Sequence, residues 1–68
     1  MNGWFKLYTT KNFAEASIIK GMLEENNIQT IILNKQDSSY IVIGEIELYV
    51  PIHLKDVAMH LLNNALLN

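Results

Sequence analysis

The residues of this chain that could do chemistry are few, and their spacing argues against a metal site. His53, Asp56 and His60 fall at i, i+3 and i+7, so in a helix they would share one side. Two imidazoles and a carboxylate suit zinc, but seven helical residues span about 10 Å, which is too far for both histidines to bind one ion. We expect no metal site, and a solvated helix face with an Asp56–His60 pair instead.

Two further pairs resemble parts of catalytic motifs. Glu45 and Glu47 lie on the same side of a predicted strand, as paired carboxylates for acid–base work would. No histidine, lysine or pocket motif accompanies them, so charges that discourage unwanted strand pairing are the favoured interpretation. Lys20 and Gly21 lie inside a predicted helix without the glycine-rich turn of a phosphate loop, and Gly21 predicts close packing of that helix on a neighbour. We therefore expect no enzyme and no cofactor.

Aromatic residues form the sharpest candidate site. Strand alternation places a group of them, with two aliphatic residues, on the sheet face away from the helices. The members of this predicted interface are Trp4, Tyr8, Ile31, Leu33 and Tyr49. A contiguous exposed apolar patch most often marks a protein interface. A floor for a small ligand, plain exposed aromatics and a base-stacking platform are the alternatives, and Lys6 is the only cation that we place on this face.

Three strands must position these residues. Alternation and β-branched or aromatic content predict strands over 4–9, 28–34 and 45–50, and Pro51 ends the last because it cannot donate a ladder hydrogen bond. The polar segment after Asn34 predicts a loop that continues to Gly44. The strand over 28–34 has no clearly polar face, so it is either central or covered by a partner.

Two helices complete the set. The first begins at Asn12, where Glu15 would complete a capping box, and ends at Asn26 and Asn27, which tolerate the left-handed conformation. The second begins at about His53. The apolar stripes predicted to dock on the sheet are Ala16, Ile19 and Leu23 in the first helix, and Val57, Ala58, Leu61 and Leu62 in the second. The facing sheet residues are Phe5, Leu7, Ile46, Leu48 and Val50.

The order β-α-β-β-α in one domain spanning 1–68 predicts an α+β, ferredoxin-like fold. Its sheet has three antiparallel strands, with both helices packed on one face. A right-handed crossover puts the third strand between the first two and leaves the first as an exposed edge. This is the ferredoxin-like arrangement without its final strand.

Composition limits the function classes. The chain has 68 residues, of which 50% are hydrophobic, and a domain this short buries only about 60% of the surface that its unfolded chain exposes, so we expect self-association. Two copies would meet through the aromatic face, which we favour, or through the edges of their first strands. No cysteine is present to form disulfides or thiolate metal sites. A net charge of −2 argues against nucleic acid, and no apolar run approaches the roughly 20 residues that span a bilayer, so we expect no membrane segment. With no secretory signal visible, we expect a cytoplasmic protein.

Several short motifs, in order, resemble a known family. They are K-L-Y-T at 6–9, E-A-x-x-I-K-G-x-L-E at 15–24, I-x-x-x-x-L-N at 28–34, V-P at 50–51 and A-x-x-L-L at 58–62. The chain resembles the small bacterial domains of unknown function grouped as putative prokaryotic signal-transducing proteins. The resemblance implies a ferredoxin-like fold similar to PII signalling proteins, and it supplies no catalytic residues. The chain departs from the family at Asn27, where a glycine is usual, and in a glycine-poor loop after Asn34.

These observations predict a small binding module of the signal-transduction type. It would act through protein–protein association, as a homo-oligomer or on a larger partner, with no catalysis of its own. The alternative is a small-ligand sensor whose moving part is the loop after the second strand, over 34–44.

Overall fold

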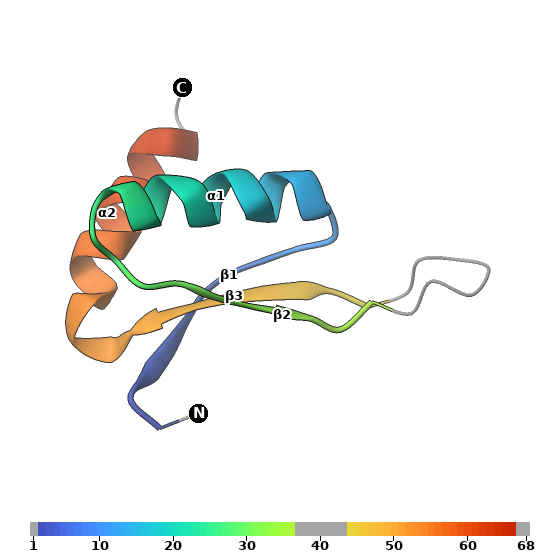
Figure 1. Cartoon of the computed structure of the whole chain (residues 1–68), viewed down its shortest axis with the longest axis horizontal. Helices are drawn as coiled ribbons and strands as arrows, with labels where there is room; N and C mark the ends of the chain where they lie inside the picture. Colours follow the sequence, from blue (N-terminus) through green and yellow to red (C-terminus); the bar gives the residue numbers. More distant parts are fainter. Residues whose placement is uncertain (1, 37–43, 67–68) are drawn as a thin grey trace.

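The computed structural model describes residues 2–36 and 44–66 (Figure 1). The elements are β1 (Trp4–Thr10), α1 (Phe13–Glu25), β2 (Ile31–Asn34), β3 (Ile46–Pro51), a 3₁₀ turn (Ile52–Leu54) and α2 (Lys55–Leu66). This β-α-β-β-α order is the predicted one. The central part of the predicted loop over 35–44 lies outside the described residues.

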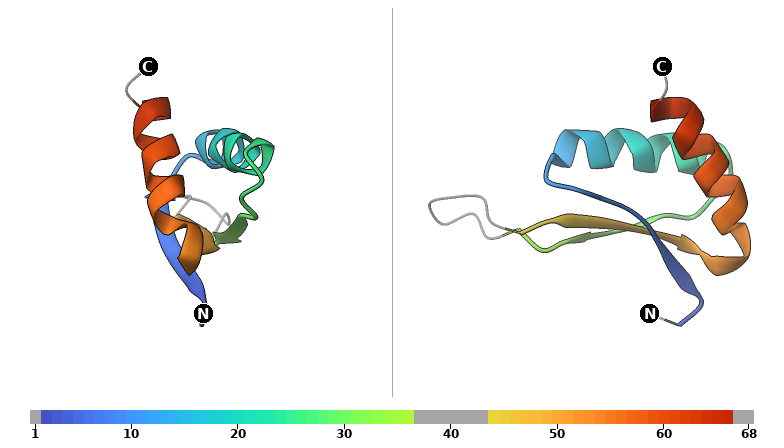
Figure 2. Two further views of the ribbon diagram at one scale, coloured as in Figure 1. Left: turned by 90° about the vertical axis from the view of Figure 1, so that its left-hand side faces the viewer. Right: turned by 180° about the vertical axis from the view of Figure 1, so that it is seen from behind.

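The sheet has the order β1-β3-β2, and both pairings are antiparallel. Both helices lie on one side of it, with α2 toward β1 and α1 toward β2 (Figure 2). The prediction of a three-stranded, ferredoxin-like α+β fold with the third strand in the middle is therefore confirmed. We call the side of the sheet away from the helices the outer face.

The ends of α1 follow from its asparagines. The Asn12 side-chain oxygen accepts a hydrogen bond from the Glu15 amide over 3.1 Å, and Asn27 takes the left-handed conformation with φ of 64°. Half of the predicted capping box is absent, because the Asn12 amide donates to Thr10 Oγ1 at 3.1 Å and the Glu15 carboxylate bonds elsewhere. Two predicted boundaries move: β2 begins at Ile31, since the Ile28 amide donates back to the Leu23 carbonyl, and α2 begins after a 3₁₀ turn.

The core lies between the helices and the helix side of the sheet. Its buried apolar residues are Ala16, Ile19, Leu23, Ile28, Ile46, Leu48, Val50, Ala58 and Leu62. All but Ile28 belong to the predicted docking set. Val57 was also predicted to dock, and this is wrong, because the residue is 53% exposed. Val57 lies about 100° around the helix from Ala58, outside the arc of α2 that the sheet and α1 cover.

A β-bulge in β1 changes which side chains face the helices. Lys6 lies opposite Tyr49 but Tyr8 lies opposite Leu48, so Leu7 is the extra residue. Beyond the bulge the alternation shifts by one residue, which turns Tyr8 to the helix side. The predicted position of Tyr8 on the outer face is therefore wrong. Leu7 remains on the predicted side and packs against the core.

Two glycines have opposite surroundings. At Gly21, no described atom beyond its chain neighbours and the backbone of its own helix turn lies within 4 Å of the position that a Cβ would take, so the predicted close packing of α1 on a neighbour is wrong. Gly44 has φ of +96°, and a Cβ there would collide with the Lys35 carbonyl oxygen. Gly44 is thus required where the chain enters β3, and Gly21 is not required in α1.

Candidate functional site

Four of the five residues of the predicted interface lie on the outer face. They are Trp4, Ile31, Leu33 and Tyr49, which we call the outer patch, and each is half-buried. The strand register places Ile31 directly opposite Tyr49 on β3. Leu33 lies opposite Glu47, and Trp4 lies opposite Pro51 at the end of β3. Their role as an interface stays a prediction.

Tyr8, the fifth residue, belongs to the helix side. Its hydroxyl donates a hydrogen bond to Glu15 Oε1 over 3.1 Å and so links β1 to the first turn of α1. Burial and then this hydrogen bond to Glu15 raise the pKa of Tyr8 above its ordinary value. Tyr8 therefore contributes to the packing of α1 on the sheet and cannot be part of the outer patch.

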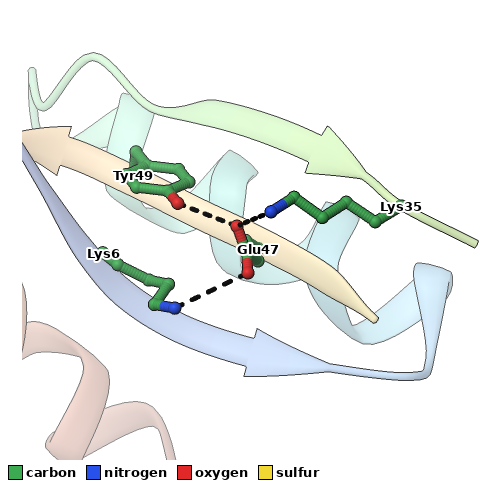
Figure 3. A network of polar contacts seen from close by, with 4 residues as sticks. All are labelled: Lys6, Lys35, Glu47 and Tyr49. Atoms are coloured by element: carbon green, nitrogen blue, oxygen red, sulfur yellow. Dashed lines mark hydrogen bonds and ion pairs between the residues drawn. The ribbon is translucent and has the colours of Figure 1, made fainter. Parts of the chain in front are cut away.

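A polar cluster lies on the outer face beside the patch (Figure 3). Glu47 is at its centre, with a side chain that is only 12% exposed. The Tyr49 hydroxyl donates to Glu47 Oε1 over 2.8 Å, and the Lys35 ammonium lies 3.2 Å from the same oxygen. The Lys6 ammonium lies 3.6 Å from Glu47 Oε2. One carboxylate thus connects side chains from β1, β3 and the end of β2.

The electrostatics of this cluster suit binding better than proton transfer. The hydrogen bond from Tyr49 and that from Lys35 lower the pKa of Glu47, and the same Glu47 contact raises the pKa of Tyr49. Near neutral pH the carboxylate is therefore charged and the phenol is protonated. A carboxylate with a lowered pKa is a weak general base, so the cluster holds a fixed charge on the sheet surface.

Lys35 is the member of the cluster that sequence reasoning missed. The polar composition after Asn34 predicts that Lys35 belongs to the loop, so Lys6 is the only cation that the sequence places on this face. The backbone nevertheless continues in register, since the Lys35 amide donates to the Glu45 carbonyl over 3.0 Å. Extending the alternation of Ile31 and Leu33 by two residues would have placed Lys35 on the outer face.

The remaining candidate residues stay apart from the cluster. His53, Asp56 and His60 are exposed, and Lys20 pairs with Glu24 at 2.7 Å along α1. Over residues 2–36 and 44–66, no group of three or more histidines and carboxylates could hold a metal ion. The expectation that zinc does not bind tightly stays a prediction for calorimetric titration.

A groove of about 340 Å³ lies on the helix side, between the first half of α1 and the end of α2. Its lining residues are Asn12, Ala14, Glu15, Ile18, Ile19, Ala65 and Leu66. Among the described lining residues most are apolar, and Glu15 is the only one with an ionisable side chain. The groove could hold an apolar group.

The strand order and the two helices on one face define a small α+β domain of the ferredoxin-like class. The family described as "putative prokaryotic signal transducing protein" matches residues 4–65, and the chain belongs to this family. The match extends from the start of β1 almost to the end of α2, and it confirms the resemblance seen in the sequence motifs. Searches of curated proteins and of solved structures gave no match. None of the helices in the described parts of the chain has the length and apolar character needed to cross a membrane.

Proposed function

We propose that this protein is a small cytoplasmic signal-transduction module that works by protein–protein association through the outer patch, with no catalysis of its own. The description of its family supports the signalling role. The observation that carries the proposal is that α1 and α2 both lie on the other side of the sheet (Figure 2). The apolar side chains of the outer patch are therefore available to a partner, as is usual for apolar interface patches.

The first partner to test is a second copy of the chain. The outer face carries both signs of charge, with Lys6 and Lys35 on either side of Glu47. In a two-fold contact each copy can place its carboxylate near a lysine of the other, while the outer patches meet at the centre. Tyrosine and tryptophan at such a centre commonly carry much of the binding energy.

The decisive experiment compares two isoleucine substitutions. Ile31→Glu puts a charge into the outer patch, and Ile18→Glu puts the same charge on α1, where the native residue is 72% exposed. We expect light scattering to show an oligomer for the wild type and for Ile18→Glu, and a folded monomer for Ile31→Glu, because an unpaired charge in a desolvated interface is costly. Circular dichroism establishes that each variant is folded.

Trp4 supplies an independent readout, because it is the only tryptophan of the chain. On dilution its emission should shift to longer wavelength as the outer patch becomes hydrated, and Ile31→Glu should show the shifted emission at every concentration. A wild type that stays monomeric with unchanged emission would overturn self-association. Native mass spectrometry would then reveal whether a different partner or a small molecule occupies the patch.

A further inference from the structure

The edge of β1 lies beside the outer patch, with which it shares Trp4. β1 has seven residues and is paired on one side only, with β3, whereas β2 at the opposite edge has four residues. An edge strand presents unpaired backbone N–H and C=O groups in the plane of the sheet. Within the described sheet, β1 therefore offers the longer row of unpaired backbone N–H and C=O groups.

The helix side of β1 is also incompletely covered. Leu48 and Val50, which face the helices from β3, are 0% exposed. Phe5 and Leu7, which face the same side from β1, are packed against the core but only half-buried. One more strand beside β1 would cover these side chains as β1 covers those of β3.

One flank of α2 lies beside the first half of β1. The Lys55 ammonium lies 5.7 Å from the centre of the Phe5 ring, which shows which flank of α2 is over β1. Met59 follows Lys55 by four residues and so lies on that flank, one turn further along. It is 44% exposed. Val57, two residues before Met59, points roughly 200° away around the helix and is exposed elsewhere.

Two lysines lie on opposite faces of the first half of β1. Lys6 is on the outer face with a side chain that is 52% exposed, and Lys55 is above Phe5 on the helix side. The 3.6 Å pair with Glu47 leaves about half of the Lys6 side chain exposed, where a second carboxylate could approach it. The chain as a whole has a net charge of −2, so this half of β1 is locally more basic than the rest.

We propose that the edge of β1 accepts an extended segment of another protein as a fourth strand. The segment alternates apolar residues, which pack against Phe5 and Met59, with acidic residues, which meet Lys6 on the outer face. Backbone hydrogen bonds supply affinity and the alternate side chains supply specificity, as in other cases of strand addition. The inference does not rest on binding by the outer patch.

The bulge at Leu7 limits the length of the contact. It twists the edge between Lys6 and Tyr8, and bulges protect edges from unregulated pairing. The segment therefore pairs with residues 4–6, the half of β1 that has Lys55 above it and Lys6 on its outer side.

A second copy of β1 would bring more than a strand to this edge. Because α2 lies on the β1 side of the sheet, pairing β1 with its own copy across a two-fold axis would put two α2 helices on the same side of the joined sheet (Figure 2). An extended segment brings no helix and needs only the spacing of one strand, about 4.8 Å.

A synthetic peptide of alternating valine and glutamate, labelled with fluorescein, tests the proposal on the full chain. We expect saturable binding by fluorescence anisotropy, with amide shift changes in residues 4–6 and at Met59. A peptide of the same composition with all valines before all glutamates should not bind. N-methylation at alternate residues should abolish binding, because it removes the ladder donors.

Two matched pairs of variants locate the site. Met59→Glu should weaken binding by about tenfold or more, while Val57→Glu, on the opposite flank of α2, should stay within about twofold. Lys6→Glu should also lose the acidic peptide, while Lys35→Glu, which perturbs the same Glu47 contact from the β2 side, should retain it.

Equal binding of the alternating and block peptides, equal loss in both members of a pair, or no binding at all would overturn the proposal. Ile31→Glu should leave peptide binding unchanged. The proposal for the edge of β1 and the proposal for the outer patch can therefore be refuted independently.

Discussion

The hydroxyl of Tyr8 donates a hydrogen bond to the Glu15 carboxylate across 3.1 Å, joining the bulged strand β1 to the first turn of α1. The contact exists because the bulge at Leu7 turns Tyr8 toward the helices. Glu15 also lies where the α1 dipole favours negative charge. One polar contact thus depends on the strand irregularity and on the position of the helix N-terminus.

Tyr8→Phe should lower the free energy of unfolding by about 0.5–1.5 kcal/mol, because it removes this partly buried hydrogen bond and keeps the ring. Urea denaturation measures the change. In a double-mutant cycle with Glu15→Gln, the two losses should not add, since both substitutions affect the same contact. Strict additivity in the cycle would show that the two side chains do not interact in solution.

Gly21→Ala should raise the free energy of unfolding by up to about 1 kcal/mol. The space around Gly21 is open, and alanine has the higher helix propensity. In a domain of this size we expect the melting temperature to rise by about 4–8 °C per kcal/mol.

Gly44→Ala is the matched control for Gly21→Ala and should destabilise the protein, because Gly44 has a positive φ and lies against the Lys35 carbonyl. The same sign of change at both glycines would contradict the structure around one of them.

Regular patterns made most of the fold predictable from the sequence. The stripe of α1 and the alternation of β3 each have one clear period, so the residues that they bury were identified correctly. The errors occur where a bulge interrupts the alternation of a strand, or where neighbouring elements determine how much of an apolar helix stripe is buried. The bulge at Leu7 leaves no trace in the run of apolar and aromatic residues in β1, so Tyr8 was put on the wrong face. Val57 continues the apolar stripe of α2. How much of that stripe the sheet covers depends on the assembled fold, and Val57 lies outside the covered part.

The residues of the outer patch could be predicted from the sequence, but the contacts of the polar cluster could not. Trp4, Ile31, Leu33 and Tyr49 follow from strand alternation alone. The contacts around Glu47 depend on which residues are opposite one another across strands, and the register is fixed by packing rather than by local sequence. Lys35 comes from a segment that composition assigned to a loop.

Leu48→Ala should cost about 2–5 kcal/mol, because Leu48 is completely buried at the centre of the sheet. A loss of this size could unfold a domain whose total stability is about 5–15 kcal/mol or less. Val57→Ala should change stability little, since the side chain is 53% exposed. Thermal unfolding followed by circular dichroism distinguishes the two, and similar losses for both would mean that α2 docks in a different rotation.

Glu47 should make stability depend on pH in the acid range. The Tyr49 hydrogen bond and then Lys35 lower its pKa in the folded protein, whereas in the unfolded chain it returns to the ordinary value of 4.5. The folded state therefore binds this proton less tightly, and the contribution of Glu47 is present in full above pH 4.5 and is lost as pH falls through the lowered pKa. We expect the stability difference between wild type and Glu47→Gln to shrink over that interval. Glu45→Gln, which removes an exposed carboxylate two residues earlier in the chain, should leave the acid profile closer to that of the wild type.

In Tyr49→Phe, carbon NMR titration should show the pKa of Glu47 moving back toward 4.5, because the largest cause of its depression is gone. An unchanged pKa in that variant would mean that the two lysines, rather than the phenol, hold the charge of Glu47.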